Sequence, residues 1–256
     1  MPGQRYEKRT MDIPSRTLRL SDGRQLGYAE FGPPDGSPVF YMHGFPGSRI
    51  EAMLLTRYTS ARIIALDRPG MGLSTFQPNR RYLDWPNDVI ALADHLKIEE
   101  FRILGISGGS PYVLACCKEI PRSRLRAAAI IAGAYPLELG TEGMLLPLRA
   151  LMYIAGSSFL SPLAKPLLNW EMGNLARNPD PEAFRTQFLK IMSTRPEKDR
   201  KCLEDDFVAT GVIESTREAF KQDSDGVTWD LKMIAQPWGF ELEEVDFPGL
   251  VSAVVG

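Results

Sequence analysis

Short continuous apolar runs alternate with amphipathic segments through the first half of the chain. Four such runs occupy residues 38–42, 62–66, 101–106 and 125–134. Continuous apolar runs of this length are typical of strands buried on both faces, as in a parallel sheet. Between them, segments 84–96 and 110–120 repeat apolar residues at helical spacing, and Asp84 stands where it could cap the first helix. Alternating strands and helices predict an α/β fold with a doubly wound, mostly parallel sheet.

Two alternating runs precede this pattern, at residues 17–20 and 25–31. They flank a turn that contains Asp22 and Gly23. An Asp-Gly pair between two alternating runs is a strong signal for a β-hairpin. We therefore expect a hairpin at the start of the fold.

The pattern changes after Pro136. From there to about residue 236 the segments are helix-like, with hardly any strand signal, and segments 182–192 and 198–221 are amphipathic. One more strand candidate follows at 249–255. This arrangement predicts a helical cap inserted into an α/β core. The expected core, cap and return to the core span residues 1–136, 137–236 and 237–256.

The bulk composition is that of an ordinary globular protein. Of the 256 residues, 44% are hydrophobic and 24% are charged, and the formal net charge is -2. A slightly acidic chain is not expected to bind nucleic acid, because phosphate contacts need a basic surface. Cys116 and Cys117 lie in an apolar helical stretch, and Cys202 stands apart. The apolar surroundings of Cys116 and Cys117 predict small buried side chains. Three cysteines without regular spacing do not form a disulfide framework, which favours a reducing compartment.

No targeting or membrane segment is visible in the sequence. Residues 1–9 contain no apolar run of the secretory type, and the apolar stretch 144–168 is interrupted by charges and prolines. We expect a cytoplasmic protein without a transmembrane segment. A peroxisomal location is the alternative, if a C-terminal tail outside this sequence carried an address.

The strongest chemical signal is at residues 105–109, which read G-x-S-x-G. An apolar run precedes this motif and a helical segment follows it. Gly105 and Gly109 would leave room for a sharp turn between strand and helix. Ser107 would then stand exposed at the carboxyl edge of the sheet as a nucleophile. The backbone N–H of Gly108 would point to where an oxyanion forms.

Two further motifs follow strands of the predicted sheet. His43 and Gly44 begin H-G-F-P-G, the loop type that supplies a second oxyanion donor, here the N–H of Phe45. We expect His43 to shape this loop by hydrogen bonding and not to act as a general base. The segment from Asp67 to Ser74 is a glycine-rich turn with a structural role. It lacks the spacing of a dinucleotide-binding loop, which disfavours a nucleotide-binding protein.

These three motifs, in this order, resemble the α/β-hydrolase superfamily from about Arg16 onward. The segment from Trp229 to Pro248 is similar to the cap exit of proline iminopeptidases and small esterases. The N-terminal region is similar to small fungal hydrolases, including those of toxin or secondary-metabolite gene clusters. The resemblance implies a serine hydrolase of ester-like or related small apolar substrates, without metal or organic cofactor. Apolar cap residues that fit such a substrate are Met144, Leu145, Met152, Tyr153, Phe159 and Trp170.

The sequence departs from the family in its catalytic triad. The family order is serine, then acid, then histidine, but His43 and His95 both precede Ser107. We expect the chain to end before the family's last strand and helix, and before its acid and histidine. Glu138, after the strand that follows the nucleophile helix, is a candidate acid. His95 lies on a helix face that we expect to be solvated.

Two interpretations remain open. The chain is an esterase-like or epoxide-hydrolase-like enzyme whose sequence is cut short, or it is a non-catalytic α/β-hydrolase fold that binds a small apolar ligand or a partner. In either case we expect little activity from this chain alone. We also expect self-association through the apolar edge strand at 249–255.

Overall fold

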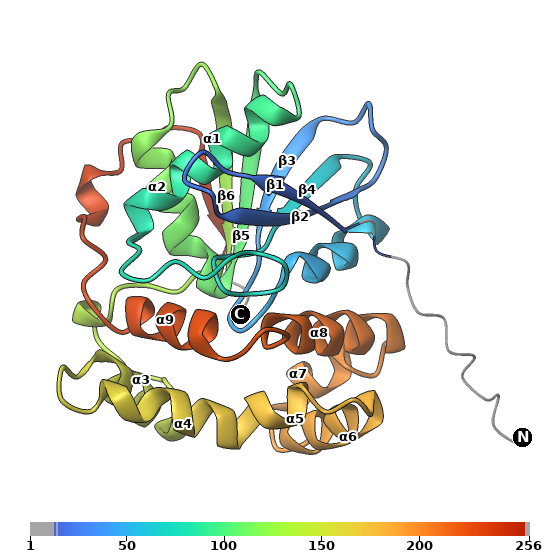
Figure 1. Cartoon of the computed structure of the whole chain (residues 1–256), viewed down its shortest axis with the longest axis vertical. Coiled ribbons are helices and arrows are strands. Elements are labelled where there is room, and N and C mark those ends of the chain that lie inside the picture. Colours follow the sequence, from blue (N-terminus) through green and yellow to red (C-terminus); the bar gives the residue numbers. More distant parts are fainter. Residues whose placement is uncertain (1–12, 14, 254–256) are drawn as a thin grey trace, which may run out of the picture.

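The computed structural model describes residue 13 and residues 15–253. Its core is one seven-stranded sheet, and most of its helices lie below that sheet in Figure 1. The strands are β1 (Ser15–Arg19), β2 (Gln25–Phe31), β3 (Pro38–Met42), β4 (Arg62–Leu66), β5 (Phe101–Ile106), β6 (Leu125–Ile131) and β7 (Leu250–Ala253). Their order is β1-β2-β4-β3-β5-β6-β7, parallel from β4 to β7 and antiparallel at β1 and β2. The predicted α/β sheet and its N-terminal hairpin are confirmed.

Helices cover both faces of the sheet, because alternate residues of each buried strand point to opposite sides. Phe40 and Ile64 pack with the helices α1 (Trp85–His95) and α2 (Ser110–Glu119) in the main core. Tyr41 and Ile63 face the other way and pack against Ala52. Ala52 belongs to η1 (Arg49–Arg57), a stretch of 3₁₀-helix.

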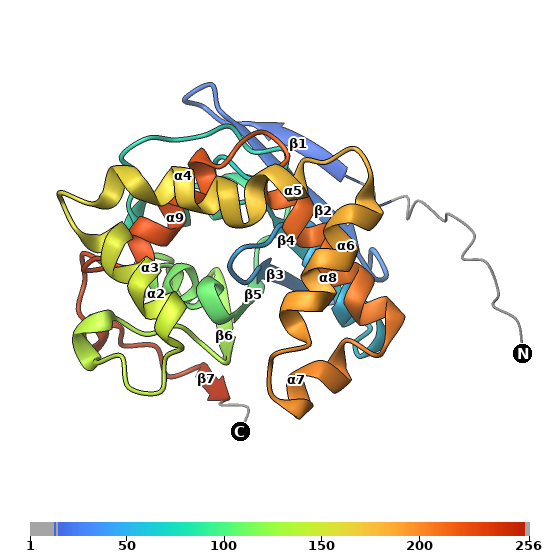
Figure 2. The same ribbon diagram turned by 90° about the horizontal axis from the view of Figure 1, so that it is seen from below.

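The cap is entirely helical in the described residues. Its elements are η4 (Leu137–Leu139), α3 (Leu146–Gly156), η5 (Ser161–Leu163), α4 (Ala164–Leu168), η6 (Asn169–Gly173), α5 (Asn174–Ala176), α6 (Pro181–Met192), α7 (Glu197–Cys202), α8 (Asp206–Ala219) and α9 (Asp225–Ile234). Helices α8 and α9 lie next to the sheet, and α3 to α6 form an outer layer (Figure 1). Viewed from the cap side, α3 to α8 frame the ends of β3 and β5 (Figure 2).

Helix α9 belongs to two apolar clusters at once. Its residues Val227 and Leu231 pack in a cap cluster with Phe184 and Phe220. Met233, near the end of the same helix, packs in the core cluster. Because one helix contributes to both clusters, the cap is packed onto the core.

Several predicted boundaries were wrong for local reasons. Strand β6 ends at Ile131 and not at residue 134, because Ala132 adopts a φ of 47°. The predicted helix 198–221 is divided into α7 and α8. At the break, the side chain of Asp205 accepts the backbone N–H of Phe207 at 2.9 Å and caps α8. Asp84 does precede α1, but its carboxylate accepts the N–H of Arg81 instead.

Strand β7 lies at one edge of the sheet, next to β6. After α9 the chain reaches it through η7 (Leu242–Glu244). The predicted strand is observed at Leu250–Ala253, and residues 254 and 255 lie outside the described part of the chain. Val251 is 65% exposed on this edge.

The two adjacent cysteines of α2 are buried and free, as predicted. Burial raises the pKa of the Cys117 thiol to about 12, so this group stays protonated at neutral pH. Cys202 is exposed on α7. Among the described residues, no helix is both long enough and apolar enough to cross a bilayer.

Candidate active site

Ser107 occupies a sharp turn between β5 and α2. Its φ is 50°, in the left-handed region that non-glycine residues rarely adopt, and the residue is exposed. Glycines on both sides make the turn possible. A Cβ on Gly105 would lie 2.5 Å from Val113, and one on Gly109 would lie 2.3 Å from the carbonyl oxygen of Met42. The strained serine between two obligatory glycines is the geometry of a nucleophile elbow.

Ser110 stabilises this turn through hydrogen bonds to the backbone. The sequence pattern does not indicate this role. The hydroxyl of Ser110 lies 2.9 Å from the carbonyl oxygen of Ser107 and 2.8 Å from that of Ala134. The N–H of Ala134 also donates to the Ser107 carbonyl, at 3.1 Å. The elbow is therefore tied to the loop that follows β6.

The two predicted oxyanion donors lie on adjacent backbone segments. A Cβ built on Gly108 would stand 3.3 Å from the backbone nitrogen of Phe45 and 2.7 Å from its Cβ. Only glycine lets the H-G-F-P-G loop approach the start of α2 this closely. The structure thus brings Phe45, Gly108 and Ser107 together at the end of β3 and β5.

His43 is fully buried and engaged within the loop. Its Nδ1 lies 2.9 Å from the carbonyl oxygen of Gly44, and its Nε2 faces the N–H of Arg68 at 3.5 Å. With the proton on Nδ1, one ring nitrogen donates and the other accepts. Burial, reinforced by the Arg68 guanidinium, lowers the pKa of His43 well below its usual value. Both ring nitrogens of His43 therefore contact backbone groups of neighbouring loop residues.

Arg68 is a second residue that the motif analysis passed over. Its guanidinium donates through Nη1 to the carbonyl oxygen of His43 and through Nη2 to that of Gly44, the latter at 2.8 Å. Its Nε lies 2.9 Å from the Asp230 carboxylate on α9. Arg68 therefore fastens the loop of Phe45 to a cap helix. The sequence feature that could have indicated this role is the position of Arg68 directly after Asp67, at the end of a buried strand.

Glu51 holds the same loop from the η1 side. Its Oε2 accepts the N–H of Gly44 at 2.6 Å and the hydroxyl of Tyr41 at 3.1 Å. Burial raises the pKa of this carboxyl, although these hydrogen bonds and the charge of Arg68 act in the opposite direction. The N–H of Gly44 is thereby engaged with Glu51.

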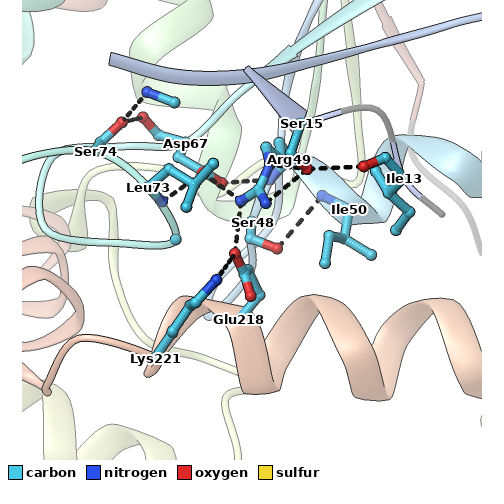
Figure 3. A network of polar contacts seen from close by, with 12 residues as sticks. Ile13, Ser15, Ser48, Arg49, Ile50, Asp67, Leu73, Ser74, Glu218 and Lys221 are labelled. Carbon is cyan, nitrogen blue, oxygen red and sulfur yellow. Dashed lines mark hydrogen bonds and ion pairs between the residues drawn. The ribbon is translucent and has the colours of Figure 1, made fainter. Parts of the chain in front are cut away.

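The carboxylate of Asp67 connects its own turn to other elements (Figure 3). Its carboxylate accepts the backbone N–H of Arg49 at 2.8 Å and that of Leu73 at 2.9 Å, and it pairs with the Arg49 guanidinium. A Cβ on Gly72 would lie 2.2 Å from Oδ2, so the turn needs glycine there. The same guanidinium reaches Glu218 of α8 at 2.8 Å.

The structure does not bring the remaining candidates to Ser107. Glu138 is exposed on η4 and lines a hollow with residues 237–244. His95 is exposed at the end of α1, which leads into the opposite end of β5. In the described part of the chain neither side chain forms a hydrogen bond or ion pair with Ser107.

A mostly parallel sheet, a serine elbow after a central strand and a helical cap together define the α/β-hydrolase fold. A family profile described as alpha/beta hydrolase fold matches residues 37–161, which contain all three motifs. The structure also resembles an epoxide hydrolase from Vigna radiata, with a TM-score of 0.55, 15% identity, and coverage of 88% of this chain and 74% of that one. A hydrolase from Pseudomonas aeruginosa gives a TM-score of 0.51 at 13% identity, covering 94% and 89%.

Curated relatives match less than half of the chain. A proline iminopeptidase from Arabidopsis thaliana is 34% identical over 125 residues, which are 44% of this chain and 33% of the relative. A bifunctional esterase/perhydrolase from Acinetobacter calcoaceticus is 30% identical over 129 residues, 49% of this chain and 47% of the relative. The matched region thus spans less than half of either relative. The chain belongs to the α/β-hydrolase superfamily.

Proposed function

We propose that this chain binds the carbonyl group of a small, apolar, ester-like substrate at Ser107, as a serine-hydrolase site. The observation that carries the proposal is the exposed, left-handed Ser107 beside the backbone nitrogens of Phe45 and Gly108. Two convergent N–H groups stabilise the negative charge that develops on a carbonyl oxygen under attack. The curated relatives, an iminopeptidase and an esterase, act on bonds to carbonyl carbon and support the same class.

The proposed chemistry is acyl transfer to the serine hydroxyl. Ser107 Oγ attacks the carbonyl carbon, and the resulting oxyanion accepts hydrogen bonds from Phe45 and Gly108. Collapse of this intermediate releases the alcohol and leaves an acyl-serine, which water hydrolyses to the acid. The proton of Oγ has to leave during attack, and the rate depends on what accepts it.

The described residues place no histidine where it could accept that proton from Ser107. Only two histidines occur in the 256 residues. His43 is buried and engaged with Gly44, and His95 is exposed on α1. Removing the histidine of a serine triad costs about a million-fold in turnover, leaving roughly a thousand-fold over water. We therefore propose slow acylation with water as the proton acceptor.

Exposed apolar side chains on the cap support an apolar substrate. Tyr153 is 72% exposed, Phe159 is 88% exposed and Trp170 is 82% exposed. Met152, by contrast, is buried in the cap cluster and is not free to contact a substrate. Large exposed apolar groups commonly mark a surface that meets an apolar partner or ligand.

Among the described residues no histidine contacts Ser107, which favours a second function, non-catalytic binding of a small apolar ligand or a partner. Both functions use the site around Ser107. They differ in whether a covalent acyl-serine forms.

Added imidazole separates the two functions, because it can supply the base that the site lacks. We expect p-nitrophenyl butyrate to acylate Ser107 slowly, with a rate that rises with imidazole concentration. Intact-mass measurement of the acylated protein checks this, with Ser107→Ala as the control for hydrolysis by imidazole alone. Ester binding without any Ser107-dependent acylation, even at high imidazole, would support the binding function.

A further inference from the structure

A cavity lies on the other side of α9 from Ser107. Its volume is about 330 Å³, and its walls come from the η2 region, α9 and the turn at 237–239. Neither Ser107 nor Phe45 lines it. Two neighbouring residues of α9, Met233 and Ile234, lie on the two different sides of the helix. Met233 lines the cavity, whereas Ile234 Cδ1 would lie 3.6 Å from a Cβ on Gly108.

Buried positive charge lies beside this cavity. The guanidinium groups of Arg68 and Arg80 both pair with Asp230, each at 2.9 Å. Among the described residues, Asp230 is the one carboxylate within ion-pair distance of either. Tyr112 also donates its hydroxyl to that carboxylate. The two buried guanidinium groups therefore share one carboxylate as their ion-pair partner, while the buried carboxyl of Glu51 also interacts electrostatically with Arg68.

Arg80 is one of the residues that line the cavity, and its guanidinium is almost fully buried. Its side chain is 2% exposed, and one of its nitrogens, Nη2, bonds to Asp230. Its Nε and Nη1 have no hydrogen-bond partner. The hydroxyl of Tyr82 and the indole N–H of Trp238, on two further lining residues, are also buried without a partner. Unpaired buried donors of this kind are rare in folded proteins and need an explanation.

The cavity walls combine aromatic rings with one more cation. Trp229 and Trp238 both line it, and the Trp238 ring packs 5.7 Å from that of Tyr82. The ammonium of Lys232 lies 5.0 Å from the centroid of the Trp229 ring, with no carboxylate in ion-pair distance in the described residues. The acidic side chains that follow the turn, Glu241, Glu243 and Glu244, are exposed and line a different hollow.

We propose that this cavity is a binding site for a small organic anion, a carboxylate attached to an apolar or aromatic body. Arg80 and Lys232 balance the charge of the carboxylate, and the unpaired donors supply hydrogen bonds once the anion is bound. Trp229 and Trp238 contact the apolar body. Aromatic walls with a few convergent polar groups are typical of small-molecule sites. The site is separate from Ser107, so the inference does not depend on the proposed hydrolase function.

Tryptophan fluorescence of the full chain tests this proposal directly, because two of its four tryptophans line the cavity. The probe is phenylacetate, and phenylacetamide is its neutral counterpart of similar shape. We expect saturable quenching by phenylacetate and at least about tenfold weaker binding of phenylacetamide, because only the anion forms charge-assisted hydrogen bonds. Equal affinity for both probes, or no saturation with phenylacetate, overturns the proposal.

Two substitutions remove the positive charge separately. Arg80→Met and Lys232→Met should each weaken phenylacetate binding by about tenfold. Lys190→Met removes an exposed lysine from α6 and should leave the affinity unchanged. Lys232 is only half-buried, so Lys232→Met should fold. Its affinity for phenylacetate therefore tests the proposal even if Arg80→Met does not fold. If Lys232→Met binds phenylacetate with unchanged affinity, the anion binds elsewhere and the proposal is overturned.

Discussion

The guanidinium of Arg49 and the carboxylate of Asp67 form an ion pair of 2.6 Å in which the two side chains are 4% and 0% exposed. Arg49 belongs to η1, directly after the H-G-F-P-G loop, and Asp67 directly follows β4. Because the same guanidinium also pairs with Glu218 of α8, one buried residue connects two core loops to the cap (Figure 3).

Replacing one partner of this pair should destabilise the protein strongly. Asp67→Asn leaves the Arg49 charge buried with Glu218 alone, and a broken buried pair typically costs about 3 kcal/mol or more. The free energy of unfolding, measured by urea titration, should fall by about that amount. Lys221→Met removes an exposed partner of Glu218 and should change it by less than about 1 kcal/mol. Similar losses for the two variants would contradict this role of Asp67.

Adding one methyl group at the elbow should reduce the reactivity of Ser107. In Gly108→Ala the new Cβ would lie 2.7 Å from Cβ of Phe45, so the loop that carries the Phe45 N–H has to move. Loss of one oxyanion donor typically costs about 100-fold in rate. The rate of Ser107 acylation in the presence of imidazole should fall by about that factor. An unchanged rate in a variant that melts at the wild-type temperature would exclude Phe45 as a donor.

His43 should make the protein less stable in mild acid. Its pKa in the folded state is well below the usual value, whereas in the unfolded state the imidazole takes up a proton near pH 6.5. The unfolded state therefore binds more protons below that pH, and this contribution to stability is lost as the pH falls. The slope is at most about 1.4 kcal/mol per pH unit.

Comparison with a His43→Gln variant isolates this effect. Burial raises the pKa values of Glu51 and Asp67, so these groups favour the folded state as the pH falls and oppose the His43 term. Urea titrations between pH 7 and pH 5 should show a steeper loss of stability in the wild type than in His43→Gln. His95→Gln, a change at an exposed position, should behave like the wild type. Parallel curves for the wild type and His43→Gln would mean that His43 is not held neutral.

Much of this architecture could be predicted from the sequence. The predicted bounds of β3, β4 and β5 agree with the structure because a continuous apolar run indicates a strand that is buried on both faces, and those of β2 agree because an alternating run beside an Asp-Gly turn indicates a hairpin strand. The elbow and the loop of Phe45 were found because glycine at fixed spacing reflects a steric requirement of the backbone. Helix breaks were missed where one polar side chain, such as that of Asp205, outweighs amphipathic periodicity.

The supporting residues of the site could not be predicted in the same way. Arg68 and Ser110 each bond to a residue 24 positions away, and Glu51 bonds to Gly44 seven positions before it across the turn of the loop. No local sequence pattern distinguishes these three from other polar residues. Arg80 and Asp230 are 150 positions apart and meet only because α9 packs on the core. Pairings of this kind depend on the tertiary structure and not on periodicity.

The edge strand β7 should promote self-association. Val251 is 65% exposed on this strand, and unpaired edge strands with apolar side chains favour pairing with another chain. Sedimentation velocity should show mass that increases with protein concentration, and Val251→Lys should reduce the increase. Leu146→Lys is the matched control, since it places a lysine at an apolar position of α3 that is 77% exposed. An equal effect of both lysines would point to the cap face instead of β7.

Whether Ser107 is a nucleophile without an adjacent base is tested most directly by the rate at which a fluorophosphonate probe labels it, followed by intact-mass measurement. We predict labelling that is confined to one site, abolished in Ser107→Ala, and slower by several orders of magnitude than in an esterase with a complete triad. Labelling as fast as that of such an esterase would mean that a base does reach the serine. Labelling that persists in Ser107→Ala would mean that the elbow is not the reactive site.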